Sequence, residues 1–180
     1  VAGKSFRDFF AGKLADLPGE RPSISDWANH LSTIFPEVRL KRYLEMRGAD
    51  GGPWRRLPAL TAYWVGLLYD DEALDACWDM VKGWSAEERQ KLRDDVPALG
   101  FKAEIGGRNI LTLAQETLRF AARGLTKRKF LDRNGRDETR YLRPLEESIA
   151  RGTTPAEELL EKFHGEWGGS VDPIFEDYAY

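Results

Sequence analysis

Polar and apolar residues alternate over 37–47, and this is the most informative pattern in the chain. The even-numbered positions form one face, which is apolar except at Arg42. Its members are Val38, Leu40, Leu44 and Met46. The odd-numbered positions form a charged face made of Arg39, Lys41, Tyr43, Glu45 and Arg47. Because side chains along a strand alternate between two faces, the pattern predicts one β-strand over about 37–47.

Elsewhere apolar residues recur at helical spacing, and the chain is expected to form about seven helices. The longest periodic stretches lie at about 54–69, 72–84, 112–127 and 139–151. Ser5 and Ser25 precede two shorter apolar stripes and are expected to start helices there.

Several residues mark where helices and turns should begin. Ser85 with Glu88, and Thr154 with Glu157, have the spacing of capping boxes. Pro53 suits the first position of a helix, because its missing N–H would have no partner there. The pair at 106–107, Gly-Gly, predicts the turn of a small hairpin.

A lone strand cannot satisfy its own backbone hydrogen-bonding groups, so the strand at 37–47 requires partners. We therefore expect an α+β fold, predominantly helical, in which one or two strands belong to an antiparallel sheet. The chain begins with Val1 rather than Met, and we expect the missing strands on a segment that precedes it. The prediction is a single domain over 1–180 that forms the C-terminal portion of a longer protein.

The amino-acid composition disfavours several classes of function. The 180 residues are 42% apolar and 32% charged, with a formal net charge of −3, which gives no general attraction to nucleic acid or an anionic membrane. No run approaches the roughly 20 apolar residues of a membrane span. Cys77 is the only cysteine, so no intrachain disulfide can form, and we expect a reducing, cytoplasmic location. Cys77, His30 and His164 are all expected to be structural.

The charged face of the strand is the candidate site. Glu45 and Arg47 should project from the same side about 7 Å apart. A carboxylate can hold a hard cation such as Mg²⁺, and a guanidinium can take the charge of a phosphoryl group. Arg39 and Lys41 extend the positive row, and Tyr43 could orient a polar group between them. The alternative is a ladder of cross-strand ion pairs on the outer face of an ordinary sheet.

The segment after the strand could complete such a site. Gly48, Gly51 and Gly52 fall where the chain must turn, and turn chemistry alone explains them. In a functional arrangement the backbone would close over a ligand at the start of the following helix, where Trp54 and Arg55 could line the same pocket.

The run from Pro36 to Leu60 closely resembles the plant and proteobacterial type of glutamate–cysteine ligase. It contains Arg-Leu-Lys-Arg-Tyr-Leu-Glu-Met-Arg-Gly-Ala-Asp-Gly-Gly-Pro-Trp-Arg-Arg. The flanking runs at 26–35, 64–70, 154–161 and 168–173 resemble the same family, so the likeness covers most of the chain.

The resemblance implies a ligase that uses ATP and Mg²⁺ to join the γ-carboxylate of glutamate to the amine of cysteine through a γ-glutamyl phosphate, the first step of glutathione synthesis. It also implies an active site on the concave face of an antiparallel sheet related to that of glutamine synthetase. In the family, the pattern Tyr-aliphatic-Glu-aliphatic-Arg supplies a metal-binding carboxylate and an arginine that meets the transferred phosphoryl group. These positions are Glu45 and Arg47.

The chain departs from the family in length, because family members are more than twice as long and their N-terminal half supplies most of the metal-binding glutamates. That half is an expected partner, together with the small-molecule substrates glutamate, cysteine and ATP. Glu45 alone should not hold Mg²⁺ usefully, so the isolated chain is predicted to be inactive. Since Cys77 has no second cysteine, the redox switch of plant members cannot close within this chain.

The charged strand is also compatible with two other classes of function. One is a non-catalytic helical interaction module whose charged strand docks on another chain. The other is nucleic-acid binding through Arg39, Lys41, Arg42 and Arg47, which the acidic balance and the central Glu45 disfavour. We expect neither nucleic acid nor a membrane as partner.

Overall fold

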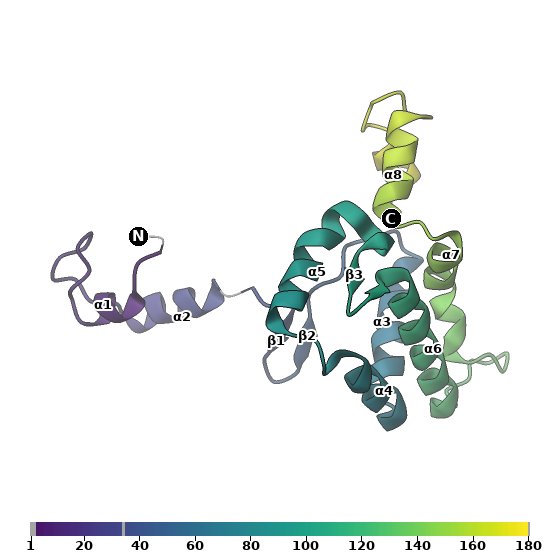
Figure 1. The fold of residues 1–180 in the computed structure, drawn as a ribbon, viewed down its shortest axis with the longest axis horizontal. Helices are drawn as coiled ribbons and strands as arrows, with labels where there is room; N and C mark the ends of the chain where they lie inside the picture. Colours follow the sequence, from purple (N-terminus) through teal and green to yellow (C-terminus); the bar gives the residue numbers. More distant parts are fainter. Residues whose placement is uncertain (1–2, 34, 180) are drawn as a thin grey trace. The chain divides into compact units, whose positions relative to one another are not determined.

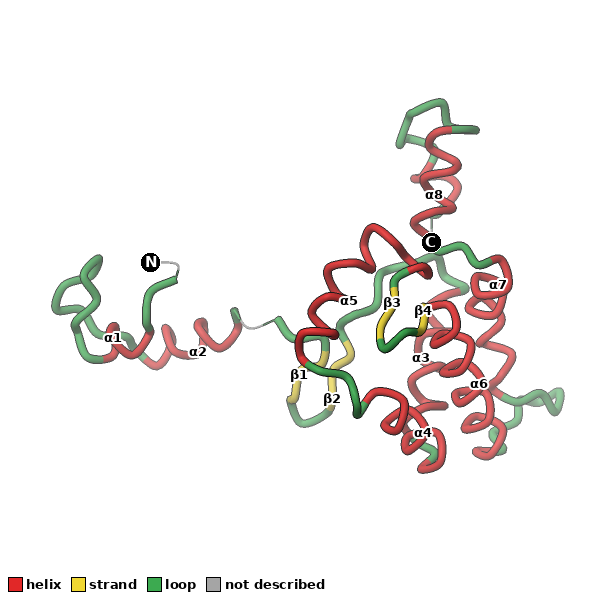
Figure 2. The backbone as a smooth tube through the Cα atoms, viewed as in Figure 1, coloured by secondary structure: helices red, strands yellow, loops and turns green. Residues whose placement is uncertain are grey.

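The computed structural model describes residues 3–33 and 35–179. They divide into two compact units, one up to Asp50 and one from Gly51, and each is described by itself. The predominantly helical character expected from the sequence is confirmed. The described residues contain nine α-helices, two short 3₁₀-helices and two antiparallel pairs of strands, shown in yellow in Figure 2.

The first unit contains two short helices and one hairpin. Its elements are α1 (Phe6–Phe10), α2 (Ile24–Ser32), β1 (Val38–Leu40) and β2 (Leu44–Met46). Ser5 occupies the N-cap of α1 but makes no side-chain cap hydrogen bond. Ser23, rather than the expected Ser25, caps α2, because it forms a capping box with Asp26. Phe6 of α1 stacks on His30 of α2 with ring centroids 4.3 Å apart, which gives His30 the structural role expected.

The single strand predicted over 37–47 is wrong, since the chain reverses direction at residues 41–43 and forms the β1–β2 hairpin. The register pairs Val38 with Met46, and Leu40 with Leu44. The backbone N–H of Lys41 donates to the Tyr43 carbonyl across the turn (2.9 Å). Arg42, the polar residue that interrupted the apolar face, lies at the centre of this turn, where no apolar side chain is needed.

The second unit contains the remaining elements, which Figure 1 colours from blue to yellow. They are α3 (Arg56–Leu68), α4 (Asp71–Val81), α5 (Ala86–Leu99), η1 (Gly100–Lys102), β3 (Glu104–Ile105), β4 (Arg108–Asn109), α6 (Ile110–Arg128), η2 (Glu138–Leu142), α7 (Arg143–Arg151), α8 (Pro155–His164) and α9 (Ile174–Asp177). Helices α3, α4, α6 and α7 pack around one core (Figure 1).

Helices α3 and α6 approach one another unusually closely. A Cβ atom added at Gly66 of α3 would lie 2.3 Å from the carbonyl oxygen of Ala121, and one at Gly124 of α6 would lie 2.0 Å from that of Gly66. Glycine is therefore required at this crossing, because no side chain fits between the two backbones. Buried apolar side chains fill the surrounding core, namely Ala62, Leu67, Leu118, Ala121, Leu125 and Leu142.

The predicted helix starts in this unit are largely confirmed. Capping boxes form at Ser85 and at Thr154, each through a reciprocal hydrogen bond with the glutamate three residues later. The hairpin predicted at 106–107 is the β3–β4 pair. Helix α3 begins at Arg56, three residues after Pro53, so the proline precedes the helix instead of opening it.

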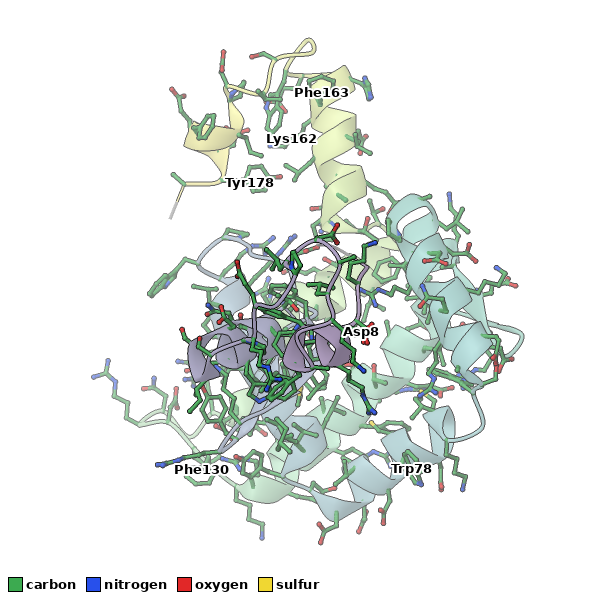
Figure 3. The ribbon with its side chains drawn as sticks, turned by 90° about the vertical axis from the view of Figure 1, so that its left-hand side faces the viewer. Asp8, Trp78, Phe130, Lys162, Phe163 and Tyr178 are labelled. Carbon is green, nitrogen blue, oxygen red and sulfur yellow. The ribbon has the colours of Figure 1, made fainter. Side chains whose placement is uncertain are left out.

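Helix α8 is tied to the core at its first turn and to the C-terminal segment near its end. The Glu158 carboxylate forms ion pairs with Arg56 of α3 (3.5 Å) and with Arg151 of α7. Lys162 forms an ion pair with Asp177 of α9 (3.0 Å) and lies over the ring of Tyr178, 5.3 Å from its centroid (Figure 3). In the part of the chain that the structure describes, no helix is both long and apolar enough to cross a membrane.

Candidate functional site

The β1–β2 hairpin gathers three cationic side chains around one carboxylate. Arg39 and Glu45 are directly opposite one another in the register, with Nε 3.5 Å from Oε2. The Lys41 Nζ also lies 3.5 Å from this oxygen, and an Arg47 guanidinium nitrogen lies 4.0 Å from it. We call these four residues the Glu45 cluster. The three cations and one carboxylate give the cluster a formal charge of +2.

The cluster is half-buried and incompletely hydrogen-bonded. Glu45 Oε2 and Arg39 Nε are both shielded from solvent and lack a hydrogen-bond partner among the described residues. At 3.5 Å with no hydrogen bond, their contact is electrostatic and leaves the guanidinium N–H without an acceptor. A buried donor without an acceptor is costly, so the cluster favours an added anion that can accept this hydrogen bond.

Aromatic rings lie beside two of the cations. Phe35 lies under the Arg47 guanidinium, whose carbon is 5.4 Å from the ring centroid, and Tyr43 lies 5.9 Å from the Lys41 Nζ. A cation over a ring face is attracted by the ring quadrupole. Phe35 therefore helps to orient Arg47. The sequence offered no sign of this contact, because Phe35 precedes β1 and lies outside the alternating pattern.

Trp54 and Arg55 belong to the second unit, where their surroundings are different. Trp54 is 72% exposed, so its ring is free to meet a ligand or another part of a protein. Arg55 is the N-cap of α3 and donates to the Glu147 carboxylate of α7 at 2.8 Å. This hydrogen bond, followed by one from Arg143, lowers the pKa of Glu147. The described contacts of Arg55 thus hold α3 to α7.

A complete magnesium site does not fit the described residues. Among them, no group of three or more histidine, cysteine or acidic side chains is arranged to hold a metal ion. Glu45 is instead surrounded by Arg39, Lys41 and Arg47, whose charges repel a divalent cation. The cluster as it stands suits the phosphate side of a metal–phosphate site, and any metal role of Glu45 needs further oxygen ligands.

Cys77 is half-buried against the core, and burial raises the pKa of its thiol. A raised pKa leaves little reactive thiolate at neutral pH. The expectation of a structural cysteine fits this environment.

Comparison with known proteins identifies the family of this chain. The model of glutamate-cysteine ligase family 2 (GCS2) matches residues 7–177. The chain belongs to the glutamate–cysteine ligase family. It is 54% identical to the chloroplastic glutamate–cysteine ligases of Nicotiana tabacum and of Arabidopsis thaliana, in alignments that cover 99% of this chain and 33% of each relative. The resemblance found in the sequence is confirmed.

The same comparisons show how much of its relatives' length the chain spans and in which compartment those relatives are named. This ligase-family chain spans about a third of the length of the curated relatives that it matches. Those relatives, which include a Solanum lycopersicum enzyme, are named chloroplastic. The cytoplasmic location predicted from the single cysteine is contradicted by these names. A reducing environment accounts for an unpaired cysteine, but it does not distinguish the cytoplasm from a plastid.

Proposed function

We propose that this chain is part of an ATP-dependent ligase that joins the γ-carboxylate of glutamate to the amine of cysteine. In this reaction a γ-carboxylate oxygen takes the terminal phosphoryl group of ATP and releases ADP. The cysteine amine then attacks the activated carbonyl carbon, the C–N bond forms, and inorganic phosphate leaves. Family membership supports the reaction class, and the observation that carries the site is the convergence of three cations on Glu45.

The proposed role of Arg47 is to stabilise negative charge on the phosphoryl group during transfer. Its guanidinium lies over Phe35 and beside Glu45, so it is held on the charged face of the hairpin before a substrate arrives. Such preorganised charge lowers the barrier, since no reorganisation is needed at the moment of reaction. Arg39 and Lys41 are proposed to hold further phosphate or the substrate carboxylates, with Tyr43 orienting a polar group beside them.

Glu45 is proposed as one oxygen ligand of a Mg²⁺ ion whose remaining ligands come from parts of the ligase beyond these 180 residues. When bound, Mg²⁺ would neutralise charge on the phosphates of ATP. Within this chain the Glu45 carboxylate attracts Arg39, Lys41 and Arg47 to one place, and this attraction needs no metal. Trp54 and Arg55 remain proposed substrate-facing residues.

The test is a chimera in which this chain replaces the aligned third of the Nicotiana tabacum enzyme. We expect Arg47→Ala to lower its turnover by about 10³-fold, the scale on which loss of one transition-state charge contact acts. Arg42→Ala is the matched control, because it removes the same charge from the turn of the same hairpin without touching Glu45. Near-normal turnover of Arg47→Ala, or an equal loss in Arg42→Ala, would remove Arg47 from the mechanism.

The isolated chain of 180 residues is expected to show no ligase activity, since the described residues hold no complete metal site. The assay is ADP release in the presence of glutamate, cysteine and Mg²⁺. Turnover by the purified chain would contradict the proposal that other parts of the ligase complete the site.

A further inference from the structure

Helix α2 carries an apolar stripe that the described residues of the first unit leave uncovered. Ile24, Trp27 and Leu31 recur at the spacing i, i+3 and i+7, which places them on one face of the helix. Ile24 is 89% exposed, Leu31 is 48% exposed and Trp27 is 43% exposed. The opposite face is polar and contains Ser25, Asp26 and Asn29. An amphipathic helix with no buried residue lacks the packing that usually stabilises a helix of this length.

The first unit cannot cover this stripe with its own residues. Phe6 of α1 packs on Trp27, with ring centroids 5.3 Å apart, and stacks on His30, while Ile24 and Leu31 stay exposed. Leu14 is the one buried hydrophobic residue among the described residues of this unit. About 50 residues are too few to enclose a sizeable core without help, so the stripe requires a surface from outside the first unit.

A membrane does not suit this helix. Helices that lie on membranes usually carry lysine and arginine beside their apolar face. The sequence of α2, Ile-Ser-Asp-Trp-Ala-Asn-His-Leu-Ser, contains neither and includes an acidic residue in its first turn. The surface that covers the stripe should therefore be protein.

The size of the stripe favours an occupant in the same polypeptide. Three such side chains can bury on the order of 400 Å² on this side. A standard complex between separate proteins buries about 800 Å² per partner, so the stripe alone is too small to recruit a second copy or a free partner. A covalently linked surface needs less area, because linkage gives it an effective concentration in the millimolar range.

We propose that the α2 stripe docks against the part of the ligase polypeptide that the matched relatives possess outside the aligned third. The aligned region takes in 99% of this chain but 33% of each relative, so about two thirds of those ligases have no counterpart here. The occupant is an apolar groove or helix face from that remainder. This proposal rests on one part of the proposed function, namely that the chain works as part of a whole ligase.

The experiment compares how fast a thiol at position 24 reacts with a maleimide in two settings. One is Ile24→Cys in the 180-residue chain, and the other is the same substitution in the Nicotiana tabacum chimera. Mass spectrometry of the labelled peptides separates position 24 from other cysteines. We expect labelling at least 10-fold slower in the chimera. Ser25→Cys, one residue along on the polar face, is the matched control and should label within about twofold of the same rate in both.

Equal labelling of position 24 in both proteins would overturn the proposal. Slowing that depends on the concentration of the isolated chain would also overturn it, in favour of a second copy. Equal slowing at 24 and 25 would contradict docking through the stripe. Leu31→Cys, with Ser32→Cys as its control, repeats the test at a second site. Unchanged labelling of the half-buried Cys77 reports an intact fold.

Ligase turnover of the chimera is measured separately on the protein without these substitutions. An active chimera with an unprotected position 24 contradicts the docking proposal alone. An inactive chimera with a protected position 24 contradicts the proposed function alone.

Discussion

An alanine at position 124 would force α6 away from α3. Its Cβ would lie 2.0 Å from the carbonyl oxygen of Gly66 and 2.9 Å from the carbonyl carbon, whereas side-chain carbons do not approach backbone atoms closer than 3.0 Å. Both contacting atoms belong to helix backbones, so no rotamer change can relieve the overlap. The helices must separate by about 1 Å, and a gap of this size forfeits a quarter to a half of the dispersion energy across the contact.

The expected cost follows from two opposing effects. Overpacking a tight interior typically destabilises by about 1–3 kcal/mol, and two rigid backbones favour the upper end of this range. Replacing glycine by alanine within a helix returns about 1 kcal/mol of helix propensity. We therefore expect Gly124→Ala to lower the free energy of unfolding by about 2 kcal/mol. For a protein of this size that corresponds to a fall in Tm of roughly 4–8 °C.

Thermal unfolding followed by far-UV circular dichroism measures this change. Gly83→Ala is the matched control, because a Cβ at Gly83 meets nothing within 4 Å. A Tm for Gly124→Ala equal to or above that of Gly83→Ala would refute the close crossing of α3 and α6.

The remaining predictions concern charge. In the chimera, Glu45→Gln should raise the half-saturating Mg²⁺ concentration severalfold, because an amide is a weaker ligand than a carboxylate; an unchanged titration would remove Glu45 from the metal ligands. The backbone N–H of Arg136 donates to Asp132 and is the main cause that lowers the pKa of this carboxyl to about 2. Since the folded-state pKa is depressed, Asp132 stabilises the fold above its ordinary value of 3.8 and loses this effect as pH falls toward about 2. Asp132→Asn should therefore flatten the fall of Tm with acid over this window, and identical slopes would count against it.

The charged site could be predicted from the sequence in part, for a geometric reason. In the β1–β2 hairpin the residue numbers of each pair add up to the same even number, as for 38 with 46 and 39 with 45. An even-numbered residue therefore always faces an even-numbered one, and an odd-numbered residue an odd-numbered one. The two faces read from an uninterrupted strand therefore survive the turn, and Glu45 still meets Arg39 and Arg47. The alternating pattern does not reveal the turn, and its one sign in the sequence is Arg42, the single polar residue on the apolar face.

Local sequence signals predict where helices begin and end, but they do not predict which segments contact one another. The capping boxes at Ser85 and Thr154 involve residues three apart, so spacing alone identifies them. The same spacing at Ser23 and Asp26 would have corrected the start of α2. The crossing of Gly66 and Gly124 joins helices far apart in the sequence, and no local pattern specifies which glycine will meet another backbone.

The attachment of α8 has a consequence for local opening. Glu158 anchors the first turn of α8 to Arg56 and Arg151, whereas Lys162 near its end is held by Asp177 of the C-terminal segment. The segment from Pro155 to Tyr178 is thus held together by its own contacts, and its ion pairs with α3 and α7 converge on the Glu158 carboxylate. Such a segment can detach as a cooperative unit while the α3–α6 core stays closed, so its amide hydrogens should exchange through sub-global opening rather than complete unfolding.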